Sequence, residues 1–233
     1  MIMSNKDAAE WQKQLDKLQM STLNELFLKH KCLKGIDLKY DEIYEADFKK
    51  LRNEPINILE IGVDQGRSIA VWLDYFPNAK IYAIDIFTRM HESRIKSLKD
   101  NRVQYLKIDS THPDVHNQVA QWKTEFDIVI DDGRHTPEAN ALTFKSIAPF
   151  LKPNGIYYIE DIWPIDQMTK PDLKNLGFDF KKQIAWAQKY RKNEFTKGKW
   201  TMFINTLKGY KIEKFDHRKR CKLLDSYIYK ITK

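Results

Sequence analysis

The chain has 233 residues, of which 42% are hydrophobic, enough for one α/β domain with its own core and no need of a disulfide scaffold. Its two cysteines, Cys32 and Cys221, stand far apart and outside any C-x-x-C or Cys/His cluster, which argues against a zinc ribbon and favours a reducing compartment. No stretch approaches the roughly 18 uninterrupted apolar residues of a spanning helix, and the first residues lack the apolar core of a signal peptide. We therefore expect a cytoplasmic protein without a membrane span.

The formal net charge of +8 is unevenly distributed. Residues 1–180 carry 24 Lys and Arg against 28 Asp and Glu, a balance of −4, whereas residues 181–233 carry 16 against 4, a balance of +12. Most of the basic residues are lysines, while side chains that read base edges or bind phosphate bidentately are more often arginines. The charge therefore makes nucleic acid an unlikely partner.

Hydrophobic periodicity predicts helices over 5–30, then a series of short apolar runs that alternate with helical stretches. The expected strands are 56–62, 80–86, 103–109, 126–132 and 155–161, and the expected helices are 68–76, 92–100, 113–124 and 136–151. Runs this continuous are typical of a parallel sheet covered by helices on both faces. Two period-two segments, 209–217 and 225–233, predict a terminal antiparallel hairpin.

This pattern favours a helical cap over residues 1–50 and a single α/β domain over 51–233. The apolar stripe of 5–30 is a candidate surface for a homo-oligomer. The irregular segment 162–205 is expected to be an insertion over the mouth of the active site.

In an open parallel sheet, ligands bind beyond the carboxyl ends of the strands. Two glycines after the first strand permit a tight turn ahead of a helix, but Asp64 stands where a dinucleotide fingerprint has its middle glycine. Asp85 ends the second strand, where a carboxylate can accept both hydroxyls of a ribose, and Asp109-Ser110 ends the third. The predicted cofactor-binding residues are Glu60, Gly62, Gly66, Ser68, Asp85, Ile86, Asp109, Ser110 and Asp131. An acidic nucleoside pocket of this kind suits the cationic ligand S-adenosylmethionine.

These strand-end residues resemble the cofactor motifs of the class I S-adenosylmethionine-dependent methyltransferases, through the E-x-G-x-x-x-G loop and the Asp residues that close the next two strands. The resemblance covers residues 55–161. It implies a Rossmann-like, seven-stranded, mostly parallel sheet whose last strand is antiparallel.

Acidic residues also follow the fourth and fifth strands. Asp132, Glu160 and Asp161 are three hard oxygen ligands on neighbouring strand ends, a set that suits Mg²⁺. His135, three residues after Asp132, is the candidate general base. The predicted catalytic residues are therefore His135 and Asp132.

The runs VIDDGRHTPEAN and GIYYIEDI narrow the resemblance to the metal-dependent sugar O-methyltransferases of macrolide biosynthesis, the mycinamicin and tylosin type. In that family the Asp of the turn and the following acidic pair bind Mg²⁺, and the turn His is the proposed base. The resemblance implies these roles for Asp132, Glu160, Asp161 and His135.

The sequence thus predicts Mg²⁺-dependent methylation of a sugar hydroxyl. Catechol-type O-methylation, N-methylation, or a non-catalytic RNA-binding or scaffold protein on the same fold remain alternatives. The basic C-terminal quarter, including Arg191, Lys197 and Lys199, is a candidate clamp for an anionic acceptor.

Overall fold

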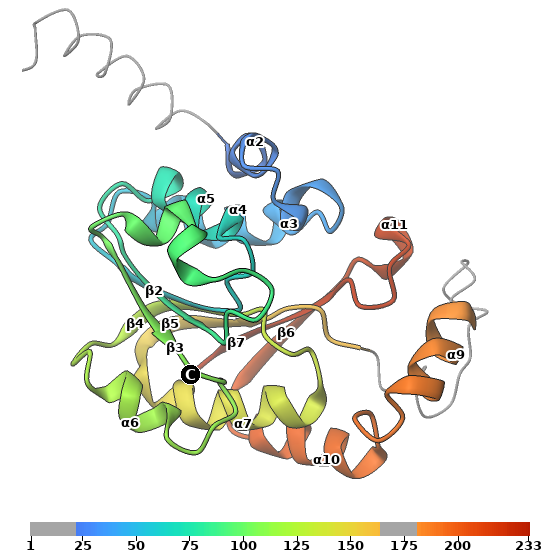
Figure 1. Ribbon diagram of the computed structural model, residues 1–233. Coiled ribbons are helices and arrows are strands. Elements are labelled where there is room, and N and C mark those ends of the chain that lie inside the picture. The colour runs from blue at the N-terminus through green and yellow to red at the C-terminus, as the bar shows by residue number, and fades with distance from the viewer. Residues whose placement is uncertain (1–21, 164–180) are drawn as a thin grey trace, which may run out of the picture.

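The computed structural model describes residues 22–163 and 181–233 and shows a seven-stranded sheet between two layers of helices (Figure 1). The strands are β1 (Asn57–Ile61), β2 (Lys80–Asp85), β3 (Val103–Lys107), β4 (Phe126–Asp131), β5 (Leu151–Ile159), β6 (Lys211–Asp216) and β7 (Tyr227–Thr232). Their order is β3-β2-β1-β4-β5-β7-β6. β1 to β5 pair in parallel, and β7 runs antiparallel to both of its neighbours. The predicted α/β fold and terminal hairpin are confirmed.

One layer contains α2 (Leu23–Lys29), α3 (Leu33–Ile36), α4 (Asp41–Leu51) and α5 (Arg67–Tyr75). The other contains α6 (Val115–Ala120), α7 (Pro137–Ile147) and α10 (Lys197–Thr206), and α9 (Lys181–Tyr190) and α11 (Arg218–Cys221) lie to one side in Figure 1. The helix expected over 92–100 forms two 3₁₀ turns instead, Glu92–Arg94 and Lys96–Lys99, and a third, Ala148–Phe150, follows α7. No described helix is long and apolar enough to cross a membrane.

The side chains of the central strands alternate between the two layers, as the pleat requires. In β1, Ile58 belongs to the buried cluster that contains α2, α4 and α5, whereas Leu59 belongs to the cluster that contains α6, α7 and α10. The same alternation decides on which face each strand-end carboxylate lies.

The helices before β1 are packed into the first of these clusters. Phe27 of α2 and Phe48 of α4 both meet the Trp72 ring of α5 edge-on, with ring centroids 5.6 Å apart in each pair. α2, α3 and α4 therefore help to cover the sheet, while residues 1–21 lie outside the described part of the chain. The division at residue 50 stays a prediction.

The segment predicted as an insertion is described in part, since residues 164–180 lie outside the described ranges. Its last helix, α10, packs on α7, and Trp200 and Phe203 are buried in the same cluster as that helix. These two rings are three residues apart, so they share one face of α10. This part of the segment covers the sheet and does not lie over the site.

The C-terminal hairpin contacts the segment between α3 and α4. Cys221 Sγ donates to the Leu38 carbonyl at 3.3 Å, and the Arg220 guanidinium pairs with the Glu42 carboxylate. The connection between β6 and β7 is thereby joined to the helical segment before β1.

Candidate active site

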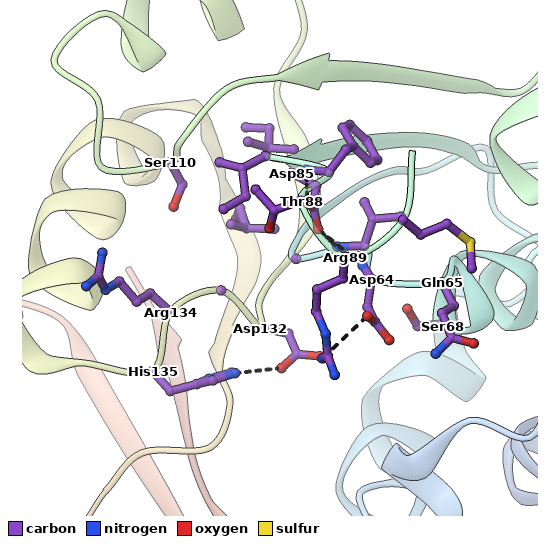
Figure 2. A pocket seen from close by; sticks show the side chains of 18 of the residues that line it. Asp64, Gln65, Ser68, Asp85, Thr88, Arg89, Ser110, Asp132, Arg134 and His135 are labelled. Carbon is purple, nitrogen blue, oxygen red and sulfur yellow. Dashed lines mark hydrogen bonds and ion pairs between the residues drawn. The ribbon is translucent and has the colours of Figure 1, made fainter. Parts of the chain in front are cut away.

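A cavity of about 660 Å³ opens at the carboxyl ends of the parallel strands (Figure 2). It is lined by residues that follow β1, β2, β3, β4 and β5, together with Cys32, Leu33, Lys34 and Leu38. The cavity lies where the sequence predicts a site, and its size suits a nucleoside-sized ligand with a second molecule beside it.

The loop after β1 makes the sharp turn that its glycines predict. Gly62 and Gly66 have φ angles of +90° and +72°, in the left-handed region that glycine adopts without strain. A Cβ on Gly62 would lie 2.0 Å from the carbonyl oxygen of Asp132, and Gly66 directly precedes α5. The loop therefore brings backbone N–H groups and the start of a helix to the floor of the cavity.

Asp85 holds this loop in place. Its Oδ2 accepts from the amides of Val63 at 2.6 Å and Asp64 at 3.1 Å, and its Oδ1 accepts from the amide of Phe87. Ile86, next to it, is 48% exposed and lines the cavity. A carboxylate beside an exposed aliphatic side chain is suited to a ribose and the ring attached to it.

Asp109 and Ser110 line the cavity at the end of β3, as predicted. Asp109 Oδ1 accepts from the amide and hydroxyl of Thr111, at 2.8 and 2.7 Å, and the Ser110 hydroxyl pairs with that of Thr143 at 2.8 Å. These contacts fix both side chains at the rim.

Two of the predicted cofactor residues, Glu60 and Asp131, are buried beneath the cavity and do not line it. Glu60 Oε2 accepts from Ser68 Oγ and Trp72 Nε1, both at 2.9 Å, and burial raises the pKa of Glu60 to about 7. Asp131 accepts from the Gly133 amide at 3.3 Å, and burial raises its pKa to about 6. Ser68, which lines the cavity, is the member of this group that a ligand can reach.

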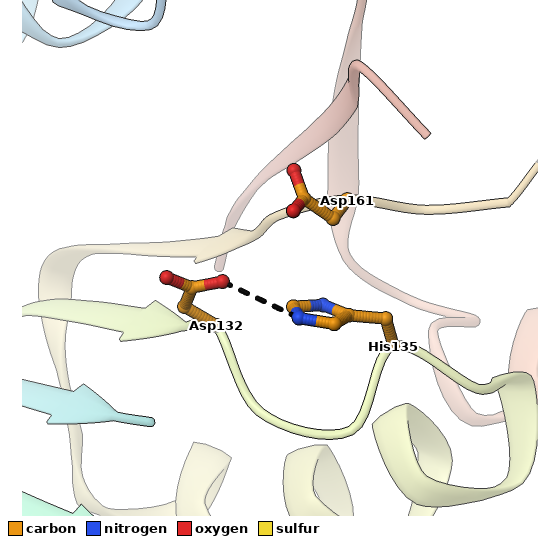
Figure 3. A group of neighbouring side chains, drawn as sticks. All are labelled: Asp132, His135 and Asp161. Atoms are coloured by element: carbon orange, nitrogen blue, oxygen red, sulfur yellow. Dashed lines mark ion pairs between the residues drawn. The ribbon is translucent and has the colours of Figure 1, made fainter. Parts of the chain in front are cut away.

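At the other end of the cavity, Asp132, His135 and Asp161 gather from the ends of β4 and β5 (Figure 3). One ligand atom of each lies within 4.8 Å of the others, and His135 Nε2 is 3.5 Å from Asp132 Oδ1. His135 and Asp161 have φ angles of +54° and +51°. Such backbone costs of order 1–3 kcal/mol per residue and clusters at functional sites.

Glu160, predicted as the third metal ligand, is not part of this group. It is fully buried, where its Oε2 accepts from Lys34 Nζ at 2.6 Å and its Oε1 accepts from the Tyr44 hydroxyl. Burial raises the pKa of Glu160 well above its usual range despite the Lys34 ammonium. Asp132 and Asp161 with the His135 nitrogen can still hold a divalent cation, since two carboxylates and an open side toward the cavity suit an ion completed by water or substrate.

Lys34 was not predicted from the sequence. It lies in α3, is 4% exposed, and donates to Asp132 Oδ2 at 2.5 Å as well as to Glu160. Nearby, the Tyr40 hydroxyl donates to Asp161 Oδ1 at 2.6 Å. The segment before β1 thus supplies a donor to each of the three predicted metal ligands.

The basic side chains expected to clamp an anion are partly engaged. Glu194 pairs with Arg134 at 3.0 Å and with Arg191 at 2.6 Å, and Lys199 pairs with Glu138. These ion pairs offset part of the positive charge that the composition gives this region.

Comparison with known proteins agrees with this geometry. A family described as "Methyltransferase domain" matches residues 59–162. The mycinamicin VI 2''-O-methyltransferase of Micromonospora griseorubida is 32% identical over 127 residues, which are 52% of this chain and 30% of that protein. The demethylmacrocin O-methyltransferase of Streptomyces fradiae is 32% identical over 149 residues, 58% of this chain and 36% of that protein. The matches span about a third of these relatives.

Among solved structures, the MycE methyltransferase from the mycinamycin biosynthetic pathway, in complex with Mg and SAH, has the same fold. The TM-score is 0.64 at 22% identity, over 91% of this chain and 54% of that one. Residues 59–162 therefore match a methyltransferase domain, and the fold and the strand-end residues that line the cavity agree with that match.

Proposed function

We propose that the protein moves the methyl group of S-adenosylmethionine to a hydroxyl of a sugar or sugar-containing small molecule. A bound divalent cation, proposed to be Mg²⁺, assists the transfer, and His135 acts as the base. The observation that carries this proposal is that Asp132, His135 and Asp161 open onto the same cavity as the ends of β1, β2 and β3. The similarity to a mycinamicin VI 2''-O-methyltransferase and a demethylmacrocin O-methyltransferase supports a hydroxyl acceptor on a sugar-containing molecule.

The cofactor half of the cavity would hold S-adenosylmethionine, which would supply the methyl group. The loop from Gly62 to Gly66 would offer backbone donors, Asp85 would accept from the ribose hydroxyls, and Ile86, Asp109 and Ser110, which line the same cavity, would contact the base. Ser68 is the remaining polar contact at this floor. These residues bind and orient the cofactor, which is the main contribution of a protein to a transfer whose reactivity resides in the cofactor.

The acceptor half of the cavity orients the hydroxyl. Asp132 and Asp161 hold the cation, which supplies Lewis acidity toward a hydroxyl group. Because Mg²⁺ prefers oxygen ligands, His135 remains available as a base. Its Nε2, the atom that faces Asp132 Oδ1, accepts the hydroxyl proton, and the carboxylate stabilises the imidazolium that results.

The acceptor is proposed to be neutral, since the ion pairs of Arg134, Arg191 and Lys199 reduce the case for an anionic one. A catechol would also offer a vicinal diol, so the two acceptor classes are separated by experiment. We also propose a cytoplasmic location and a homo-oligomeric state.

The test is methyl transfer from isotope-labelled S-adenosylmethionine to a panel of deoxyhexosyl macrolides and simple catechols, with Mg²⁺ and with EDTA. We expect transfer to a sugar hydroxyl only, abolished by EDTA and reduced about 10²–10⁴-fold in His135→Gln, because a general base contributes that much. The matched control is His116→Gln, which removes an exposed histidine that contacts the Ser146 carbonyl. Transfer to catechols alone, or full activity in EDTA, would refute the sugar acceptor or the cation respectively.

A further inference from the structure

Three carboxylates that follow or end neighbouring strands lie on one face of the sheet. Asp131 of β4 is in register with Ile61 of β1 and Ile159 of β5, so the next residues, Asp132 and Glu160, lie side by side on the opposite face. Glu60, one residue before Ile61, lies on that face as well. This is the face covered by α2, α4 and α5, where water does not reach Glu60 or Glu160, both 0% exposed.

Lys34 is the cation in the middle of these three carboxylates. Its Nζ is 2.5 Å from Asp132 Oδ2, 2.6 Å from Glu160 Oε2 and 3.6 Å from Glu60 Oε1. Burial alone disfavours its ammonium, but the surrounding carboxylates outweigh that effect and raise the pKa of Lys34 well above its usual value. A buried charge is tolerated only when it is paired in this way.

The segment that carries Lys34 is fastened on both sides. Gly35 approaches the Phe27 ring so closely that a Cβ would lie 2.5 Å from that side chain. Tyr40 and Tyr44 bind the Asp161 and Glu160 carboxylates, and Cys221 of α11 holds the Leu38 carbonyl. Lys34 is therefore a fixed part of the site and not a surface side chain that has folded inward.

The two carboxylate oxygens of Asp132 are thereby divided between two partners. Oδ2 accepts from Lys34, and Oδ1 is the oxygen that faces His135. Glu160 has both oxygens engaged, one by Lys34 and one by Tyr44. Of the three predicted metal ligands, Asp132 and Asp161 line the cavity and Glu160 does not. The Asp132 oxygen left free of Lys34 is Oδ1.

We propose that Lys34 is a resident cation of the acceptor site: it holds Glu160 out of the ligand set of the divalent ion and orients Asp132 so that Oδ1 alone serves that ion. Lys34 is a positioning residue in this scheme, because it acts through Asp132 and Glu160. The inference rests on the proposed function for the presence of a divalent ion, but it concerns which residues bind that ion and not what is methylated.

The consequence is a divalent site weaker than three carboxylates would give. A fixed positive charge beside Asp132 repels a second cation, and the ion is bound through Asp132 and Asp161 only. The departure from the ligand set implied by the family resemblance is thus attributed to one side chain, Lys34.

The experiment is calorimetric titration of the full chain with Mn²⁺, and with Mg²⁺, in the absence of acceptor and cofactor. Lys34→Met is expected to bind Mn²⁺ at least 10-fold more tightly, because Asp132 Oδ2 and Glu160 become free to coordinate. Glu160→Gln is expected to change the affinity less than threefold, whereas Asp161→Asn lowers it more than 10-fold. Lys39→Met is the matched control, a lysine in the same segment whose ammonium contacts only the Gly35 carbonyl among the described groups.

Equal weakening in Glu160→Gln and Asp161→Asn would overturn the proposal, as would unchanged Mn²⁺ affinity in a folded Lys34→Met. If Lys34→Met does not fold, two other variants replace it. Lys34→Arg keeps the charge and is expected to keep the weak affinity. The double variant Lys34→Met/Glu160→Gln removes one charge of each sign. The double variant is expected to bind Mn²⁺ at least threefold more tightly, since Asp132 Oδ2 is freed, and no gain would count against the proposal. Failure of sugar methylation leaves these affinities measurable, so the two proposals fail separately.

Discussion

The two halves of the cavity hold their carboxylates in different ways. In the cofactor half, Asp85 is satisfied by backbone amides of the adjacent loop, 21 and 22 residues away along the chain. In the acceptor half, Asp132 and Glu160 are satisfied by a lysine 98 and 126 residues away. One half is organised by its own strand-to-helix turns, and the other by a segment that returns from before the sheet.

Because the two halves are held by different segments, we expect substitutions in one half to leave the other unchanged, except where the two halves are in contact. One contact is at Gly62, whose missing Cβ makes room for the Asp132 carbonyl, and another is between Glu60 and Lys34. Variants in one half are therefore expected to leave ligand binding in the other half intact, and a variant at the Gly62 contact is expected to damage both.

The largest effect is expected for Gly62→Ala. A Cβ would lie 2.0 Å from a backbone oxygen, at a φ of +90° that alanine adopts only with strain. Strain and overpacking together give a loss of about 3 kcal/mol or more in the free energy of unfolding, with loss of both cofactor and Mn²⁺ binding. Urea denaturation measures it.

The matched control is Gly198→Ala, in the first turn of α10, where a Cβ would meet nothing within 4 Å. This substitution is expected to leave stability unchanged or raise it by up to about 1 kcal/mol. If Gly62→Ala behaves like this control, the two halves are not in the contact described.

The next effect is that of Asp85→Asn on the cofactor half alone. An amide offers one acceptor oxygen, and its NH₂ group faces an N–H of the loop, so at least one charge-assisted hydrogen bond is lost, at about 1.5–3 kcal/mol. We expect roughly 10-fold or greater weakening of S-adenosylhomocysteine binding in calorimetry. Mn²⁺ affinity should stay at the wild-type value, and a parallel loss of it would show that the halves are coupled.

The sequence predicts the cofactor half of the cavity better than the acceptor half. The strand ends Asp85, Asp109 and Ser110 were placed correctly because strand-to-helix turns are local. Glu60, one residue before the end of β1, and Asp131, the last residue of β4, lie on opposite faces of the sheet, and both are buried beneath the cavity by the helices that cover those faces. Lys34 could not be found locally, since nothing near it shows where the segment before β1 returns. Two buried carboxylates, Glu60 and Glu160, beside a third at the cavity wall do, however, favour a cation from elsewhere in the chain.

A smaller effect concerns the packing of that returning segment. Burial raises the pKa of Cys32, two residues before Lys34, to about 12, so at pH 8 roughly one thiol in 10⁴ is ionised and its alkylation is slow. Cys221 is less buried and is expected to react with iodoacetamide first, as peptide mass spectrometry would show. Fast labelling of Cys32 in wild-type protein would mean that the segment opens readily and that the acceptor half is not rigid.

The smallest effect is expected at the outer edge of the same segment, where Asp74 of α5 pairs with Lys29 and His30 at the end of α2, both at 2.7 Å. Partial burial opposes the Asp74 charge, but the hydrogen bonds from His30 and Lys29 outweigh it and lower the pKa of Asp74 below its usual 3.8. A carboxylate whose pKa is lower in the folded protein than in the unfolded chain stabilises the fold at pH values above the unfolded-chain pKa. This contribution is lost as the pH falls through the pKa of the folded protein. Because these groups are partly exposed, Asp74→Asn should cost only about 0.5 kcal/mol at pH 7. Thermal denaturation from pH 7 to pH 2.5, against exposed Glu54→Gln, should show the difference shrink as the pH falls below 3.8 and vanish below the lowered pKa of Asp74. A difference that persists in acid would instead assign the contact to packing, so that α2 would be fixed to α5 by its apolar side chains alone.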